Sequence, residues 1–112
     1  MSVTPRVLVQ PVLLAVGTTT QYTVPAGTRC IIDKATVVNT TTTTRTFSVY
    51  IVPSGGSVAA ANFVIDARAV VQDETYLCPE LVGQVLGPGD FIATEASAAS
   101  ALALRISGRE VT

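Results

Sequence analysis

Apolar and polar positions alternate most regularly between Thr44 and Val52. In an extended chain the two faces carry Phe47, Val49 and Ile51 on one side and Thr46, Ser48 and Tyr50 on the other. This period of two predicts a half-buried β-strand. A second extended segment, Thr28–Val38, precedes it, and a tip made only of threonines, Thr40–Thr44, separates the two. The sequence therefore predicts a β-hairpin whose apolar face is covered by the rest of the chain.

The segment Thr28–Val38 carries apolar residues on both of its faces. Strict alternation assigns Ile31, Ala35 and Val37 to one face and Cys30, Ile32 and Val38 to the other. A strand with two apolar faces is typical of the centre of a packed sheet. We therefore expect this segment to be a central strand covered on both sides.

Shorter extended segments follow one another about every eight to twelve residues, with turn residues between them. The predicted strands are Thr18–Val24, Phe63–Arg68, Tyr76–Pro79, Leu81–Leu86, Phe91–Glu95 and Ala101–Arg109. Ser57–Asn62 is expected to be a loop or a single helical turn. The strongest turn signal is Gly87-Pro88-Gly89-Asp90. This pattern predicts an all-β, jelly-roll-like antiparallel β-sandwich, with residues 18–112 forming one domain.

Residues 1–17 are apolar but are interrupted by Pro5 and Pro11. Proline removes a backbone donor, so such a segment fits only an edge strand or an extended arm. The two alternatives stay open from the sequence. As an arm, the segment would lie on a neighbouring subunit; as an edge strand, it would complete its own sheet.

The composition favours a protein that is assembled with neighbours. Of the 112 residues, 48% are hydrophobic, 5% are aromatic and only 13% are charged. A soluble domain usually has roughly 25% charged residues, so this chain has few charges to cover its surface. The seven basic and eight acidic residues give a net charge of -1 and are scattered singly along the sequence. Without a basic stripe, we expect no binding to nucleic acid.

The sequence offers no recognisable set of catalytic or metal-binding residues. Histidine is absent, which removes the usual general base, and Cys30 and Cys78 lack a CxxC or Cys/His context. The two cysteines either pair in one disulfide or, as the favoured interpretation, remain as two buried thiols. The apolar run Val12–Val16 is far shorter than the about 20 residues that span a bilayer. We expect a soluble protein that is not secreted, not an enzyme, and without cofactor, metal or small-molecule substrate.

Four motifs resemble a group of small structural proteins of tailed bacteriophages. They are Tyr22–Thr28 (YTVPAGT), the strand end Val37–Thr40 (VVNT), Phe47–Gly56 (FSVYIVPSGG) and Leu86–Ile92 (LGPGDFI). The likeness spans about residues 20–108 and consists of strand and turn signals. It implies a β-sandwich that is a structural component of the virion, assembled in the host cytoplasm.

Two positions in the virion fit this resemblance. One is a capsid decoration or cement protein that binds the phage head, contacts the major capsid protein and itself as a dimer or trimer, and stabilises the shell. The other is a tail, neck or fibre-associated protein that contacts the host surface through the loops Thr40–Arg45 or Ala96–Ser100. The compact single domain favours decoration. The residues proposed for the interface are Val7, Val9, Val12, Leu14, Arg45, Tyr50 and Arg109.

Overall fold

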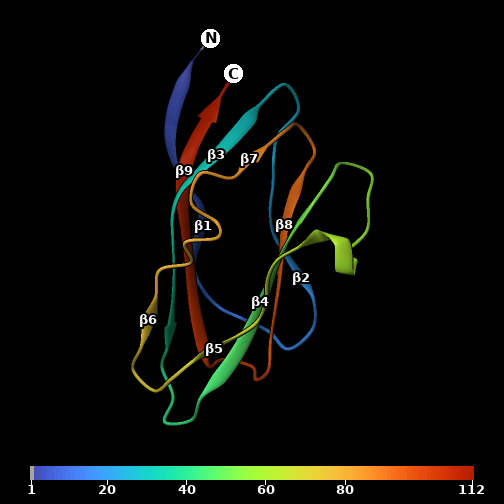
Figure 1. The fold of residues 1–112 in the computed structure, drawn as a ribbon. Helices are drawn as coiled ribbons and strands as arrows, with labels where there is room; N and C mark the ends of the chain where they lie inside the picture. Colours follow the sequence, from blue (N-terminus) through green and yellow to red (C-terminus); the bar gives the residue numbers. More distant parts are fainter. Residues whose placement is uncertain (1) are drawn as a thin grey trace.

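The protein is a sandwich of two antiparallel β-sheets, which the computed structural model describes for residues 2–112 (Figure 1). Sheet A has the order β1-β9-β3-β6, and β7 also pairs with β3; sheet B has the order β2-β8-β4-β5. The strands are β1 (Val3–Leu13), β2 (Thr19–Thr23), β3 (Arg29–Asn39), β4 (Arg45–Val52), β5 (Phe63–Val70), β6 (Thr75–Tyr76), β7 (Val85–Leu86), β8 (Phe91–Ala96) and β9 (Leu102–Val111). A short 3-10 turn, η1 (Ala60–Asn62), precedes β5. This arrangement confirms the predicted antiparallel β-sandwich.

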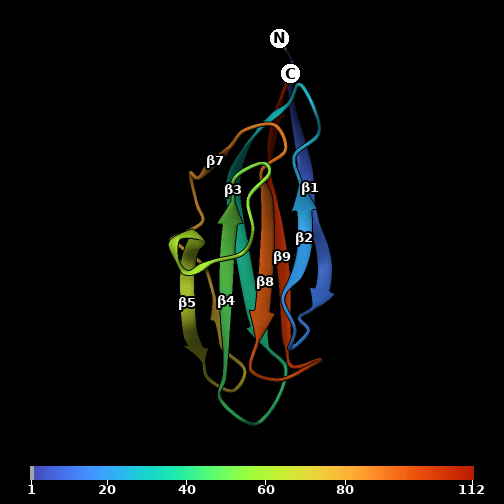
Figure 2. The same cartoon turned by 90° about the vertical axis from the view of Figure 1, so that its right-hand side faces the viewer.

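The predicted hairpin is wrong, although both of its strands exist. β3 pairs with β9 in sheet A, whereas β4 pairs with β8 and β5 in sheet B. The threonine tip therefore crosses from one sheet to the other (Figure 2). Asn39 fixes this corner, because its Nδ2 donates hydrogen bonds to the Thr43 and Val70 carbonyl oxygens, both at 2.8 Å. Alternation located both strands but not the strands that lie beside them.

β3 is a central strand, but it is not covered on both sides. Its buried apolar residues are Cys30 and Ile32, then Ala35 and Val37. The pairing with β9 shifts register between Ile32 and Lys34, so Asp33 is the extra residue of a β-bulge. The extra residue reverses the alternation, and all four apolar side chains reach the same inner face. The outer face of β3 is polar or partly exposed.

β4 is buried more completely than the half-buried strand that was predicted. Phe47 and Val49 belong to the main core between the sheets. On the outer face Tyr50 and Val52 form a second, smaller apolar cluster, against which Phe63 packs. The Tyr50 and Phe63 rings stack with centroids 4.4 Å apart. Val58, in the segment that joins β4 to β5, packs against the same cluster, so this segment covers part of the outside of sheet B.

The segment Leu81–Leu86, predicted as a full strand, is mostly a turn. Only Val85 and Leu86 pair with β3. Gly83 adopts a φ of +86°, which favours glycine, and its N–H donates to the Ile32 carbonyl oxygen at 2.8 Å. Leu81 is fully buried within this turn, so its apolar character reflects packing and not strand pairing.

The structure decides between an extended arm and an edge strand for residues 2–17. Residue 1 lies outside the described part. β1 is the edge strand of the protein's own sheet A and pairs with β9 over most of its length. The two chain ends meet there, since Ser2 and Thr112 exchange backbone hydrogen bonds of 3.0 and 2.9 Å. Figure 1 shows both termini at the same end of the sandwich. The described segment is therefore not a free arm in this fold.

A buried polar contact ties the two sheets together near the chain ends. The Tyr22 hydroxyl on β2 donates a hydrogen bond to the Glu110 carboxylate on β9. The other carboxylate oxygen of Glu110 lies 3.3 Å from Nε of Arg6 on β1. Glu110 is only 8% exposed, so both of its oxygens need these partners.

Candidate functional site

The outward edge of β1 is the first candidate interaction surface. Ser2 forms a hydrogen-bonded pair with Thr112, and alternation then turns the backbone groups of Val3, Pro5 and Val7 away from β9. Pro5 occupies one of these outward positions, where its missing N–H breaks no bond of the sheet. Val3 and Val7 each keep a free outward N–H and carbonyl, which a further strand could pair with.

The side chains of β1 divide between the core and the surface. Four large apolar side chains of residues 2–17 are exposed: Val3 at 51%, Val7 at 37% and Leu13 at 49% on β1, and Val16 at 56% after it. Leu8 and Val9 are buried in the core instead, because a register shift lies between Val7 and Val9. The segment therefore offers an apolar outer edge while it also contributes to its own core.

These positions narrow the interface predicted from the sequence. Val9 and Leu14 are 3% and 1% exposed and pack in the chain's own core, so their prediction as partner contacts does not hold in this fold. Val12 is partly buried against the same core, and Val7 is exposed. Alternation on one strand could not separate these residues, because the irregularities at Val7–Val9 and Val9–Val12 each change the exposed face.

The polar residues predicted for the interface occupy three separate positions. Tyr50 is 6% exposed, and its hydroxyl donates to Glu95 Oε1 at 2.5 Å. Arg45, at the start of β4, is partly buried, and its Nε has no hydrogen-bond partner among the described residues. Arg109 is exposed on sheet A and holds Asp33 through Nε and Nη2 at 3.0 Å. The structure does not bring these three residues together.

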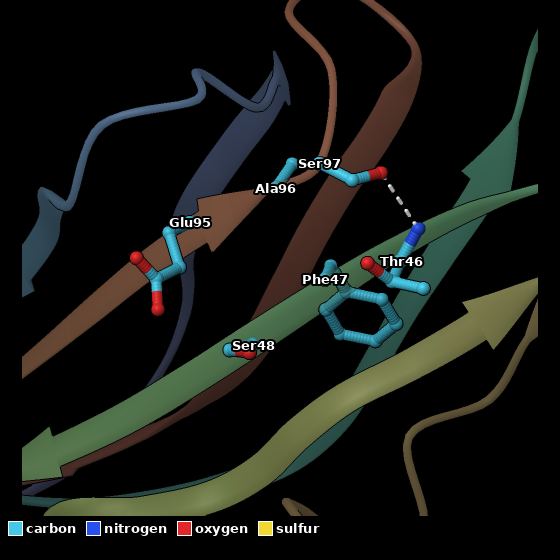
Figure 3. Close-up of a pocket in the computed structure, with 6 residues that line it drawn as sticks. All are labelled: Thr46, Phe47, Ser48, Glu95, Ala96 and Ser97. Carbon is cyan, nitrogen blue, oxygen red and sulfur yellow. Dashed lines mark hydrogen bonds between the residues drawn. The ribbon is translucent and has the colours of Figure 1, made fainter. Parts of the chain in front are cut away.

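A small polar hollow lies on sheet B between β4 and β8 (Figure 3). Its lining residues are Thr46, Phe47, Ser48, Glu95, Ala96 and Ser97. Ser48 and Glu95 are direct neighbours across the two strands. Ser48 Oγ accepts a hydrogen bond from the Ala67 N–H at 2.9 Å, while Glu95 accepts from Tyr50 and Thr18. Both groups thus stabilise the fold.

Two acidic residues stabilise turns. The Asp90 carboxylate accepts from the N–H groups of Ser54 and Gly87, at 2.9 and 2.8 Å. Glu74 Oε1 accepts from the Val71 N–H at 3.0 Å. Within residues 2–112, no group of three or more Cys, Asp or Glu side chains is placed to hold a metal ion. The same residues contain no helix of the length and apolar character needed to cross a membrane.

Cys30 and Cys78 are fully buried free thiols, which confirms the favoured interpretation of the two cysteines. Burial raises the pKa of Cys30 to about 11 and that of Cys78 to about 12, because the apolar surroundings disfavour the thiolate. The pKa of Tyr76 is also raised to about 12, first by burial and then by its hydrogen bond to Glu80. The fold therefore favours the neutral form of all three groups.

These shifted pKa values predict a loss of stability at alkaline pH. In the unfolded chain the thiols ionise near pH 9.0, so their stabilising effect is complete below pH 9 and declines as the pH rises toward 11 or 12. Each buried thiol contributes a slope of up to about 1.4 kcal/mol per pH unit. Urea unfolding between pH 8 and about 10.5, followed by circular dichroism, gives the free energy of unfolding at each pH. The decrease of this free energy per pH unit should be smaller for Cys78→Ala than for the native chain. Equal slopes would contradict the role of this thiol.

The fold gathers basic residues that look scattered in the sequence. Arg29, Lys34, Arg105 and Arg109 all lie on the outer face of sheet A, since the buried residues of β3 and β9 occupy the opposite face. The basic residues that are scattered singly along the sequence therefore lie near one another on this face. Arg105 and Arg109 are four residues apart, which is a same-face spacing on a strand, but the bulge at Asp33 hides the matching positions on β3. The expectation of no binding to nucleic acid stays a prediction.

Comparisons of the chain with protein-family models, with curated proteins and with solved structures found no match.

Proposed function

We propose that this chain is a structural protein of a tailed bacteriophage virion, and that it decorates the head by binding the outside of the shell. The observation that carries the proposal is the apolar edge of the sandwich. Of the eight large apolar side chains that are exposed within residues 2–112, four belong to one short segment: Val3, Val7, Leu13 and Val16. An exposed apolar edge strand favours association with another chain. The resemblance of the strand and turn motifs to phage structural proteins supports the same function.

The binding mode that fits this edge is strand addition. A strand of a neighbouring major capsid protein, or of a second copy of this chain, would pair with the outward backbone groups of Val3 and Val7. The side chains of Val3, Val7 and Leu13 would lose contact with water at the same time. Interfaces of standard size bury about 1,600 Å² in total, and many symmetric copies on a shell add avidity to modest single contacts.

A sedimentation experiment tests the proposal directly. Purified protein is mixed with empty capsids and, separately, with tails of the phage, and the bound fraction is measured after centrifugation. We expect saturable, stoichiometric binding to capsids and a higher resistance of the shells to heat. Binding to tails alone would contradict the decoration function and favour the tail position.

Charged substitutions identify the edge that binds. The double variant V3K/V7K should lose capsid binding by about tenfold or more, because two lysines would have to be desolvated at the interface. The control V71K/V82K adds the same charge at two exposed valines outside β1, which are 52% and 51% exposed. The control should bind as the native chain does. Native binding by V3K/V7K would exclude this edge as the docking surface.

The arrangement of two loops favours a tail-associated protein as the second candidate. The Thr40 N–H and hydroxyl both donate to the Ala101 carbonyl oxygen, at 2.9 and 3.0 Å, and the Ser97 N–H donates to Thr46 at 2.9 Å. These contacts bring the threonine tip and the loop after β8 to one end of the sandwich, opposite the chain termini (Figure 1). A joint loop surface of this kind suits contact with a host surface. Binding of purified protein to host cells, and not to capsids, would support it.

A further inference from the structure

Four side chains on the outer face of sheet A surround a hollow with a volume of about 270 Å³. They are Lys34 and Thr36 on β3 and Arg105 and Ser107 on β9. Lys34 pairs directly with Ser107 across the sheet, and Thr36 pairs with Arg105. Directly opposed residues have Cβ atoms about 5 Å apart, so the four side chains form a compact rectangle with the two cations at diagonal corners.

The four side chains lack partners within the described part of the protein. Neither the ion pairs nor the side-chain hydrogen bonds of residues 2–112 include Lys34, Thr36, Arg105 or Ser107. The nearest acidic residue in sequence, Asp33, is held by Arg109 in a bidentate pair and is thereby neutralised. The hollow thus presents two positive charges and two hydroxyl groups without a negative charge of its own.

We infer that this quartet is an anion-binding site for a phosphate dianion, either inorganic phosphate or the terminal group of a phosphomonoester. Lysine, arginine and hydroxyl groups are all donors toward phosphate oxygens, and the two cations match the two negative charges of the dianion. A phosphodiester carries only one negative charge and would leave one cation uncompensated. The inference does not depend on the proposed function, because the quartet lies on β3 and β9 and not on the β1 edge.

Amide NMR titrations at an ionic strength of about 0.1 M, where the Debye length is about 10 Å, test the site. Inorganic phosphate, glycerol 3-phosphate and dimethyl phosphate are added separately to the ¹⁵N-labelled full chain. We expect saturable shifts centred on residues 34–36 and 105–107 for the first two, and at least about tenfold weaker binding of the diester, which offers one charge fewer. No saturable shifts, or equal affinity for the diester, would overturn the inference. A response to glycerol 3-phosphate alone would identify a monoester as the ligand.

Matched variants separate a built site from general attraction to a basic face. K34Q and R105Q should each weaken phosphate binding by about tenfold or more, since each removes a charged donor. R29Q is the control, because Arg29 is an exposed cation on the same face that does not line the hollow. R29Q should change the affinity for phosphate by less than about twofold, because Arg29 does not contact the bound anion and dissolved ions screen its charge. Equal losses in R29Q and K34Q would overturn the site. The same spectra confirm that each variant is folded.

Discussion

Replacing Gly108 with valine is expected to destabilise the protein by about 3 kcal/mol or more. A Cβ atom at Gly108 would stand 2.2 Å from the Ile31 carbonyl oxygen and 3.0 Å from Leu8 Cδ1. The first of these atoms is backbone of the neighbouring strand, so a side-chain rotation cannot relieve the contact. Urea unfolding followed by circular dichroism measures the loss. Gly108→Ala should already show most of the effect, because the clash begins at Cβ.

Gly17 provides the matched control for this substitution. A Cβ atom at Gly17 would meet no atom within 4 Å. Gly17→Val should therefore change the free energy of unfolding by no more than about 0.5 kcal/mol, as exposed substitutions commonly do. If Gly108→Val were as stable as Gly17→Val, the close approach of β3 and β9 at the bulge could not be a property of the folded protein.

The bulge opposite Gly108 illustrates why the positions of the strands were predicted from the sequence better than the way in which the strands pack. Apolar alternation is a local signal, and it located β4 and β9 within one or two residues. The bulge at Asp33 is set by the pairing of β3 with β9 across about seventy residues of chain, so a local period cannot contain it. Gly108 lies opposite this bulge, and the absence of a side chain there allows the close approach of the two strands.

The error about the hairpin has a similar cause. A hairpin and a crossing between two sheets both place an apolar face on each strand, and the threonine tip fits either connection. The deciding contacts are those of Asn39, whose side chain bonds to a carbonyl oxygen 31 residues away on β5. A buried Asn at a strand end is a signal for such a corner only once its partners are known.

The candidate interaction surfaces were predicted less well than the fold. The sequence indicated an apolar N-terminal segment, and Val7 is exposed on it, but the register shifts that bury Val9 depend on β9. The basic hollow was missed because its members come from two strands. Lys34 and Ser107 are 73 residues apart and become neighbours only through the pairing of β3 with β9.

Deleting residues 2–13 is expected to prevent folding and not to release a stable domain. The deletion removes β1, which covers one side of β9 and buries Leu8 and Val9 in the core. Burial of each such side chain contributes about 1.5–3 kcal/mol, and the lost strand pairing adds to this. The total is a large part of the 5–15 kcal/mol that stabilises a typical domain. Circular dichroism and thermal unfolding should show no cooperative transition in the truncated chain.

The variant V3S/V7S separates the strand's structural contribution from its exposed surface. It changes only two exposed side chains of β1 and leaves Leu8 and Val9 in the core, so its cooperative unfolding should match that of the native chain closely. Capsid binding can then be measured on a folded protein, which the deletion would not allow. A truncated chain that keeps the native transition would contradict this account. β1 would then be a detachable segment, free to leave its own sheet and lie along a neighbouring subunit.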